Sequence, residues 1–439
     1  MSCLSLREFQ LREELVSLVE TLIEDVHARK IYDSRGNPTI EVEVITADGF
    51  GRASAPSGAS TGIHEAVPFP KGSVDVAVKL VNDVIAQKLI GMDATNQIAI
   101  DRTLREIDGT DNFSNIGGAA AIATSIATAK AAASSLGIPL FQYIGGALVR
   151  EMPYPLGNII GGGRHAGDRS PNVQEFLVIP VGAKNYVEAV EVCFKVHREV
   201  GRLIKNIDGS FAGGRGDEGA WAANISDEDA LRILRDACEK VQSETGFKVV
   251  LGVDMAASSM WNSKMGVYVL RREDKVRTRE EQLNYVLEIA EKYDLRYVED
   301  PLHEEDFDGF SQLIKSLGHK SLICGDDLFT TNVKRIKLGL NLRAANAVII
   351  KPNQVGTLSD TYEAVNVAKS GGLTPVMSHR SGETEDDFVC HLAIGLRCPI
   401  IKIGVLGGER IVKHNELIRI EESLGNIKSM AELPPQLTR

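Results

Sequence analysis

Six short apolar segments in the second half of the chain each lead to a charged or imidazole residue. In the segments VVLGVDM, LRYVED, LICGDD, AVIIK, TPVMSH and IIKIG, these residues are Asp254, Glu299, Asp326, Lys351, His379 and Lys402. Three carboxylates held close together need a hard cation such as Mg2+ between them. A lysine beside that cation could remove a proton from a carbon next to a carboxylate group. This chemistry requires a fold that brings the six side chains to one place.

The spacing of the six residues indicates which elements would position them. Asp254 and Glu299 are 45 residues apart, and the later intervals are 27, 25, 28 and 23 residues. Stretches of helical periodicity fill these intervals, for example residues 279–293 and 360–369. A buried strand followed by an amphipathic helix, repeated at such intervals, is typical of a parallel α/β barrel, in which the strand C-termini open onto one face. We therefore expect three acids, two lysines and a histidine to converge on one barrel mouth.

The first third of the chain has a different pattern. Leucines and valines at helical spacing over residues 5–25 predict an amphipathic helix. Residues 37–57 alternate and contain an Asp-Gly turn, which predicts an antiparallel hairpin or meander, and helical segments follow at 74–90 and 117–137. The Ala and Gly residues of the second segment indicate close helix packing. Gly and Pro residues near position 150 mark a boundary, after which we expect the barrel to be entered through FLVIP.

These patterns predict three parts of the chain. They are an N-terminal helical extension over residues 1–22, an α+β cap domain over 23–150 and an α/β barrel over 151–439.

Composition narrows the class of partner. The chain has 439 residues and a net charge of −11 with no basic run, so we expect neither nucleic acid nor a membrane as a partner. An anionic substrate would need a site that is positive only locally. The six cysteines form no CxxC pair, and no signal peptide or membrane-spanning run is present. We therefore expect reduced thiols and a cytoplasmic protein.

Several motifs resemble those of the enolase (phosphopyruvate hydratase) family. They are HARKIYDSRGNPTIEVEV, PSGASTG, NVQEF, GDEG, EDP, GDDL, IKPNQVGTL, SHRSGETED and NELIRIEE, and the resemblance runs from about Ile23 to the C-terminus. It implies an α+β cap domain followed by a mixed α/β barrel made mostly of parallel βα units. The chain departs from the common family pattern at Ala119, at Gly161 and Arg164 in GGGRHA, and at residues 407–410, and in these respects it is similar to archaeal enolases.

The resemblance implies a carbon–oxygen lyase of glycolysis and gluconeogenesis. Its reaction would be the reversible dehydration of 2-phospho-D-glycerate to phosphoenolpyruvate, with two Mg2+ per active site in a homo-oligomer, a dimer or an octamer. The implied catalytic residues are Lys351 as base and Glu218 as acid, with Glu175 hydrogen-bonded close by. The implied metal ligands are Asp254, Glu299 and Asp326, together with Ser60 for a second ion. The implied substrate contacts are His165, Gln174, Glu175, His379, Arg380, Ser381 and Lys402.

Physical arguments agree with three of these roles. Burial and neighbouring cations would lower the pKa of Lys351 toward that of a usable base. Nearby acids would raise the pKa of Glu218, as a proton donor requires. Arg380 and Ser381 follow a predicted strand, and a guanidinium beside a hydroxyl at a helix N-terminus would bind phosphate.

Each role has a structural alternative. Acids that follow strands often cap the next helix, and Lys351 could extend to solvent. Arg380 could instead pair with the acids of GETEDD, and Glu175 and Glu218 could be solvated surface residues. Two other functions are also open: a related barrel enzyme that acts on a non-phosphorylated acid, and an enolase-like protein kept for binding or scaffolding. Ser60, Arg380 and Ser381 argue against the first, and the intact Lys351 and metal carboxylates argue against the second.

Overall fold

Alternating residues after Ile23 form a three-stranded antiparallel meander in the computed structural model, which describes residues 20–58, 62–167 and 169–439. Its strands are β1 (Ile23–Tyr32), β2 (Pro38–Thr46) and β3 (Phe50–Ser54). The predicted meander is confirmed. The predicted helix over 5–25 is wrong for residues 23–25, which pair with β2, and residues 1–19 lie outside the described part of the chain. Backbone pairing with a neighbouring strand therefore overrides the helical spacing at its end.

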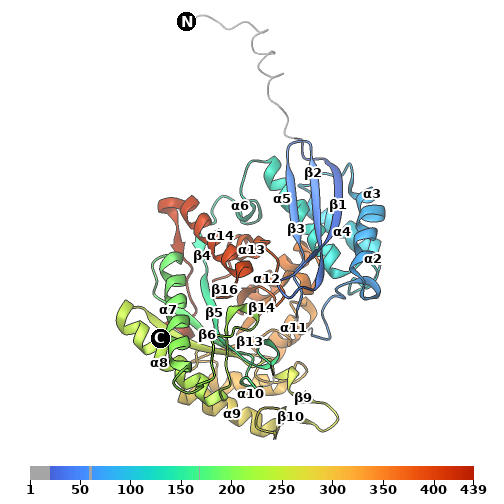
Figure 1. Ribbon diagram of the computed structural model, residues 1–439. Coiled ribbons are helices and arrows are strands. Elements are labelled where there is room, and N and C mark those ends of the chain that lie inside the picture. Colours follow the sequence, from blue (N-terminus) through green and yellow to red (C-terminus); the bar gives the residue numbers. More distant parts are fainter. Residues whose placement is uncertain (1–19, 59–61, 168) are drawn as a thin grey trace, which may run out of the picture.

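Helices cover one face of the meander (Figure 1). They are α2 (Val74–Leu80), which continues through a π-helical turn (Val81–Ile85) into α3 (Ala86–Leu89), then α4 (Gln97–Asp108), α5 (Gly118–Ser135) and α6 (Leu140–Gly145). The Ala-rich α5 packs directly on the strands: a Cβ added at Gly51 of β3 would lie 1.9 Å from the carbonyl oxygen of Ala127. The predicted close helix packing is confirmed.

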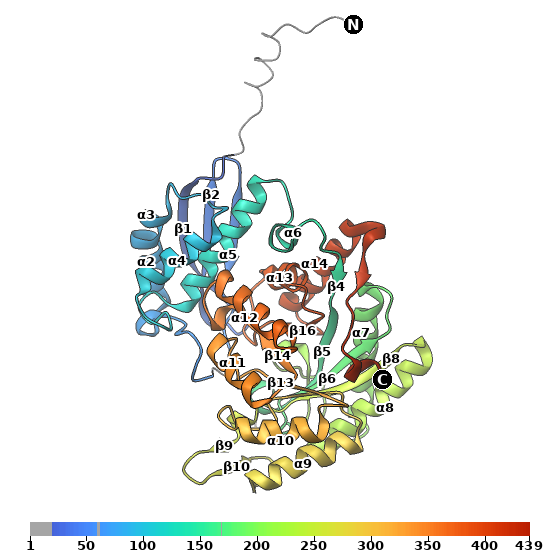
Figure 2. The same ribbon diagram turned by 180° about the vertical axis from the view of Figure 1, so that it is seen from behind.

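Eight strands close into a barrel beside this cap (Figures 1 and 2). The strands are β5 (Tyr154–Gly161), β6 (Glu175–Val181), β8 (Lys248–Asp254), β12 (Tyr297–Glu299), β13 (Leu322–Gly325), β14 (Ala347–Ile350), β15 (Thr374–Ser378) and β16 (Ile400–Gly404). Pairing of β16 with β5 completes the ring. All neighbouring pairs are parallel except those made by β6, which is antiparallel to β5 and β8. The predicted mixed barrel is confirmed.

The expected entry strand of the barrel is wrong. The first barrel strand is β5, inside the predicted barrel range 151–439, whereas FLVIP belongs to β6. Pro155, Gly157 and Asn158 interrupt the apolar pattern of β5, so the sequence does not mark it as a strand although the whole strand is buried.

Helices surround the barrel on its outer side (Figure 2). They are α7 (Tyr186–Ile204), α8 (Asp227–Thr245), α9 (Arg279–Lys292), α10 (Phe307–Leu317), α11 (Val333–Leu342), α12 (Leu358–Ser370), α13 (Phe388–Gly395) and α14 (Gly408–Leu424), with the short α15 (Pro435–Thr438) at the C-terminus. The two helices predicted over 279–293 and 360–369 are confirmed as α9 and α12.

Smaller strands account for the irregular spacing. An antiparallel sheet is inserted after β8, and it explains the long interval between Asp254 and Glu299. Its strands are β9 (Trp261–Asn262), β10 (Val267–Leu270) and β11 (Lys275–Thr278). Elsewhere, β7 (Trp221–Ala222) pairs with β5, and β4 (Glu151–Met152) pairs with β17 (Ser429–Met430).

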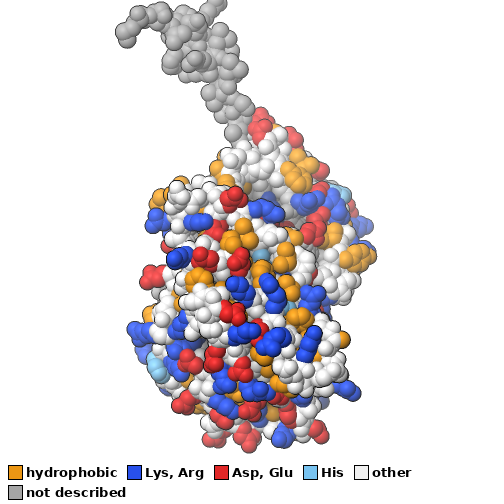
Figure 3. All heavy atoms as spheres, turned by 60° about the vertical axis from the view of Figure 1, so that its left-hand side comes forward, with side chains coloured by type: hydrophobic (Ala, Val, Ile, Leu, Met, Phe, Trp, Pro, Cys, Tyr) orange, Lys and Arg blue, Asp and Glu red, His pale blue; other side chains and the backbone are white. Residues whose placement is uncertain are grey.

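Charged side chains of both signs are interspersed over the face drawn in Figure 3, and hydrophobic side chains occur there singly or in small groups. Within the described residues, no helix combines the length and apolar character needed to cross a membrane. Five cysteines are buried and form no disulfide, while Cys3 lies outside the described range.

Candidate active site

A polar cavity lies at the mouth of the barrel. Nearly all of the predicted site residues line it: His165, Gln174, Glu175, Glu218, Asp254, Asp326, Lys351, His379, Arg380, Ser381 and Lys402. Glu299 does not line the cavity but is fully buried beside it, where it contacts Lys402. Ser60 lies outside the described residues.

Lys402 connects three carboxylates at the mouth. Its Nζ lies 2.9 Å from Asp254 Oδ2, 2.8 Å from Glu299 Oε1 and 3.2 Å from Glu175 Oε2. Burial alone would lower the pKa of Lys402, but these carboxylates outweigh it and raise the pKa well above its usual value. Lys402 is the third residue of β16, so its side chain enters the mouth from within the strand. It is therefore a permanently charged ammonium group among acids.

Antiparallel β6 explains how Glu175 reaches this mouth. Because β6 runs against its neighbours, its first residue lies level with the last residue of β8, and Glu175 pairs in register with Asp254. The side chain is buried. The alternative that Glu175 is a solvated surface residue is wrong.

Lys351 follows β14 and donates a hydrogen bond to Asp326 Oδ2. Burial alone would lower the pKa of Lys351, but the Asp326 carboxylate outweighs it, and the pKa is raised. The prediction of a lowered pKa is therefore wrong for this arrangement of the site. The positive charges of Arg380 and Lys402 lower the pKa of Lys351, as predicted, but their effect is smaller than that of the Asp326 carboxylate. The side chain is only 14% exposed, so Lys351 does not extend to solvent.

The three predicted metal carboxylates come from adjacent strands. Asp254 ends β8, Glu299 ends β12 and Asp326 follows β13. The helices that follow these strands are capped by other residues, namely Thr278, Asp306 and Asn332, so the helix-capping alternative is wrong.

The donor set fits a hard divalent cation. All three groups offer carboxylate oxygens, the ligands that Mg2+ prefers. Burial, with a smaller contribution from the Asp254 carboxylate, raises the pKa of Glu299 to about 8, although Lys402 and Lys351 oppose this increase. The two lysines thus neutralise the negative charge of these acids only in part, and a divalent cation would neutralise the rest. Asp326 also belongs to a second group of closely spaced acids. Carboxylate oxygens of Asp300, Asp326 and Asp327 lie within 4.8 Å of one another, and this group does not include Asp254 or Glu299.

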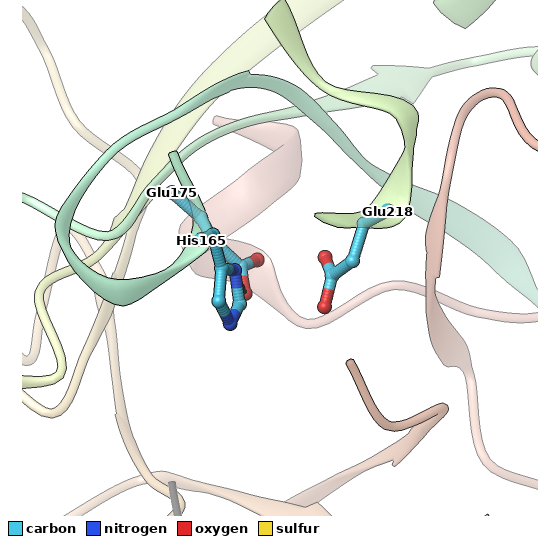
Figure 4. Close-up of side chains that lie close together, drawn as sticks. All are labelled: His165, Glu175 and Glu218. Atoms are coloured by element: carbon cyan, nitrogen blue, oxygen red, sulfur yellow. Dashed lines mark ion pairs between the residues drawn. The ribbon is translucent and has the colours of Figure 1, made fainter. Parts of the chain in front are cut away.

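Glu218 faces His165 and Glu175 across the cavity (Figure 4). Ligand atoms of the three side chains lie within 4.8 Å of one another. Burial would raise the pKa of Glu218, but His379, His165 and Arg410 outweigh it and lower the pKa well below its usual value. Burial and then the Glu218 carboxylate raise the pKa of Glu175 well above its usual value. The prediction of a raised pKa is therefore wrong for Glu218, and Glu175 is the member of the pair whose pKa is raised.

An unusual backbone conformation aims Glu218 into the cavity. Glu218 has a φ of 66°, in the left-handed region, and its side chain is only 4% exposed. A Cβ added at Gly404 of β16 would lie 2.2 Å from the Glu218 carbonyl oxygen, so only glycine allows this approach. Asn158 Nδ2 donates to Glu218 Oε2 at 3.0 Å. Glu218 is therefore a held, buried group and not a solvated one.

Arg380 and Ser381 lie in a loop and not at a helix N-terminus, because α13 begins only at Phe388. That part of the phosphate-site prediction is wrong. The Arg380 guanidinium pairs with Glu65, with Nη1 2.9 Å from Oε2 and Nη2 3.2 Å from Oε1. Among the acids of GETEDD, Glu383 accepts a hydrogen bond from the Arg380 backbone amide at 2.9 Å.

Sequence reasoning missed several supporting residues. Fully buried Arg410 on α14 contacts the loop after β15, and Glu65 pairs with Arg380. Asn158 and Tyr297, which donates to Glu299 Oε2 at 2.7 Å, lie on barrel strands. A polar residue in an apolar run could have pointed to Asn158. No local signal marks Glu65 or Arg410, since their partners are more than 25 residues away in sequence.

Some buried polar atoms at the cavity have no hydrogen-bond partner among the described residues. Gln174 Oε1 and His165 Nδ1 are two of them, and His165 Nδ1 lies 3.6 Å from Glu175 Oε1. Buried polar atoms in proteins are nearly always satisfied by protein, water or ligand. The cavity therefore suits a compact, highly polar ligand.

Comparisons with known proteins agree with this geometry. Residues 23–144 match the family model "Enolase, N-terminal domain", and residues 149–433 match "Enolase, C-terminal TIM barrel domain". The protein named enolase from Methanosphaera stadtmanae is 53% identical over 94% of this chain and 100% of its own length. The enolase of Methanothermobacter thermautotrophicus is 53% identical over 95% and 100%, and that of Archaeoglobus fulgidus is 52% identical over 91% and 97%.

Proposed function

Because this chain belongs to the enolase family, we propose that it catalyses the reversible dehydration of 2-phospho-D-glycerate to phosphoenolpyruvate and water. This is the activity of a carbon–oxygen lyase in glycolysis and gluconeogenesis. The observation that carries the assignment is the convergence of Lys351, Glu218 and three buried carboxylates on one polar cavity. A base, an acid and a cation site are the groups that this reaction needs.

Lys351 would remove the proton from C2 of the substrate. Its amine must first be neutral, and in the present arrangement the Asp326 carboxylate keeps it charged. Arg380 and Lys402 oppose the charge on Lys351, so that charge depends on Asp326, which is one of the residues that would hold the cation. The base would therefore become competent only in the loaded site.

Glu218 would give a proton to the departing C3 hydroxyl group. Glu175 is the member of the pair with the raised pKa, and one of its carboxyl oxygens lies within 4.8 Å of one of Glu218, a separation that one water molecule would bridge. We propose that the two carboxyl groups act together, with Glu218 nearest to the leaving group and Glu175 as its proton partner.

Positive and polar groups would orient the substrate. Lys402 would hold the substrate carboxylate, and Arg380 with Ser381 would bind the phosphate, since a guanidinium matches phosphate geometry. His165, Gln174, Glu175 and His379 would complete the contacts, and two of these residues present the unpartnered polar atoms described above.

Asp254, Glu299 and Asp326 would hold one Mg2+. When bound, the ion supplies positive charge beside the substrate carboxylate and so favours loss of the C2 proton. We propose a second Mg2+ at Ser60, on the family resemblance alone.

A turnover assay tests the function directly. Purified protein with 2-phosphoglycerate and Mg2+ should produce the ultraviolet absorbance of the enol product. No turnover by folded, metal-loaded protein would favour a binding or scaffolding role. Turnover of non-phosphorylated hydroxy acids instead would favour a different enzyme of the superfamily.

We further propose the domain limits 1–22, 23–150 and 151–439, a homo-oligomer of two or eight chains, and a cytoplasmic location. The five free, buried cysteines support a reducing compartment. Deleting residues 2–20 should leave turnover intact if the extension lies outside the catalytic unit. Light scattering of the purified protein measures the number of chains.

A further inference from the structure

A second hollow near the catalytic cavity is lined by four arginines, and none of the described residues that line it is acidic. It has a volume of about 350 Å3, and the arginines are Arg35, Arg164, Arg271 and Arg272. We call this hollow the arginine antechamber. Four like charges around one concavity contrast with a chain whose net charge is −11. Concave sites lined by one sign of charge focus the electric field and attract counter-ions.

The four arginines come from three separate segments. Arg35 lies in the turn between β1 and β2, and Arg164 lies in the short helical turn after β5. Arg271 and Arg272 lie in the turn between β10 and β11. No helical or strand periodicity brings these residues together, so their grouping is a product of the tertiary fold.

Two of the arginines are anchored by protein partners. Arg35 Nε lies 3.5 Å from Asp217 Oδ2, and Arg272 Nη1 donates to Asn224 Oδ1 at 3.0 Å. By contrast, the exposed side chains of Arg164 and Arg271 make no ion pair or hydrogen bond with any residue that the structure describes. The antechamber therefore has two fixed guanidinium groups and two with their donors available.

Residues that are adjacent in the chain connect the antechamber to the catalytic cavity. Arg164 lines the antechamber, while the next residue, His165, lines the cavity. The Asp217 partner of Arg35 is followed by Glu218, which also lines the cavity. An anion held in the antechamber would thus lie close to segments that carry His165 and Glu218 into the catalytic cavity.

We propose that the arginine antechamber is a second anion-binding site, which takes small multivalent anions of the phosphate and phosphorylated-acid class. Guanidinium forks bind phosphate and carboxylate oxygens in pairs, which suits such ligands. The concave shape of the hollow and the acidic character of the whole chain favour a small anion over a nucleic acid or a membrane surface. The ligand has two sources: the substrate itself on its way to the cavity, which rests on the proposed function, or a separate phosphorylated metabolite.

Binding is tested with inorganic phosphate, titrated calorimetrically in chelated buffer of low ionic strength. The variants are Arg164→Ala/Arg271→Ala, its charge-preserving counterpart Arg164→Lys/Arg271→Lys, and the control Arg102→Ala/Arg198→Ala. The control removes two exposed arginines of α4 and α7 that do not line the antechamber. Wild type should bind one more phosphate per chain than the double alanine variant. The lysine and control variants should retain that phosphate.

A kinetic measurement distinguishes the two sources. If the substrate uses the antechamber, the double alanine variant should lose on the order of tenfold in kcat/KM at low ionic strength, with kcat unchanged and the loss vanishing in high salt. If a separate metabolite uses the antechamber, kcat/KM of the double alanine variant in the absence of phosphate should equal the wild-type value. Phosphate should then affect turnover of the wild type non-competitively and have no such effect on the variant.

Two results would overturn the proposal. One is the same phosphate stoichiometry and affinity in wild type and in the double alanine variant. The other is an equal loss in the control variant, which would reflect net charge alone. An inactive wild type that still shows the antechamber phosphate would contradict the proposed function and leave the anion site standing.

Discussion

Arg410 determines the tautomer of His379. Arg410 Nη1 lies 2.7 Å from Nδ1 of His379, and the Gly404 amide also donates to that atom, at 3.3 Å. Because a guanidinium has no acceptor, Nδ1 must accept, and the ring proton must lie on Nε2. Burial lowers the pKa of His379 to about 4, so the ring is neutral at physiological pH. Its Nε2–H therefore faces Glu218 Oε1, 3.2 Å away.

Replacing Arg410 by methionine should release His379 and the loop that follows. The Arg410 guanidinium also donates to the carbonyl oxygens of Arg380, at 2.6 Å, and Ser381, at 2.7 Å. We expect kcat to fall on the order of tenfold and the free energy of unfolding to fall by roughly 3 kcal/mol, since hydrogen bonds of charged groups contribute ~1.5–3 kcal/mol each.

Nitrogen chemical shifts of the His379 ring measure the tautomer directly. The Nε2–H form should be replaced by a mixture in Arg410→Met and partly restored in Arg410→Lys. Arg419→Gln, on the exposed side of α14, serves as the control. An unchanged Nε2–H signal in Arg410→Met would show that other contacts set the tautomer.

The two halves of the reaction should separate by mutation. Lys351→Ala should stop exchange of the C2 proton with solvent deuterium as well as product formation. Glu218→Gln should stop product formation and leave C2 exchange measurable, because Lys351 remains. General acid or base groups typically contribute ~10²–10⁴-fold in rate, so losses of that size are expected in each case.

Proton NMR of 2-phosphoglycerate in D2O follows both steps in one sample. Lys315→Ala, on the exposed surface of α10, is the matched control for the loss of a lysine. Exchange at a near wild-type rate in Lys351→Ala would mean that another group is the base.

Metal removal should abolish turnover, and Asp326→Ala should weaken Mg2+ binding. The buried carboxylates at the mouth are only partly neutralised by Lys351 and Lys402, so they favour a bound cation. Equilibrium dialysis measures Mg2+ bound per chain, with Asp308→Ala on exposed α10 as the control. Full activity of wild type in thoroughly chelated buffer would contradict the proposed mechanism.

His414 should make the fold less stable in acid. Burial lowers the pKa of His414 to about 4. The neutral ring donates from Nε2 to the Gly404 carbonyl oxygen at 3.0 Å, so Nδ1 accepts from the Tyr186 hydroxyl group at 2.8 Å. Between pH 6.5 and 4 the unfolded chain binds a proton here that the folded chain does not. The contribution of neutral His414 to the free energy of unfolding is therefore complete above pH 6.5. It falls by up to roughly 3 kcal/mol as the pH is lowered from 6.5 to 4.

Denaturant unfolding at several pH values checks this dependence. His414→Gln should be less stable at neutral pH and should show a flatter decline between pH 6.5 and 4. His27→Gln, on the exposed side of β1, should keep the wild-type slope. A parallel slope in His414→Gln would show that other groups control the acid response.

The sequence by itself determined the barrel strands after β5, several of the barrel helices and the charged residues at the mouth. Apolar runs such as those before Asp326 and Lys351 must be buried strands, and burial forces the residue after each run to the strand end. Motifs that are contiguous in the chain, such as GDEG and SHRSGETED, also identified the family. Local pattern is sufficient for such features because hydrophobic burial acts on each segment separately.

Only the tertiary structure decided the orientation of β6, the partners of the charged groups and the direction of their pKa shifts. The reversed β6 delivers Glu175 to the mouth, where it and not Glu218 has the raised pKa. Asp326 raises the pKa of Lys351, which burial alone would lower. These outcomes depend on distances of a few ångströms between segments far apart in sequence. Electrostatic energies change steeply over such distances, and no local pattern contains them.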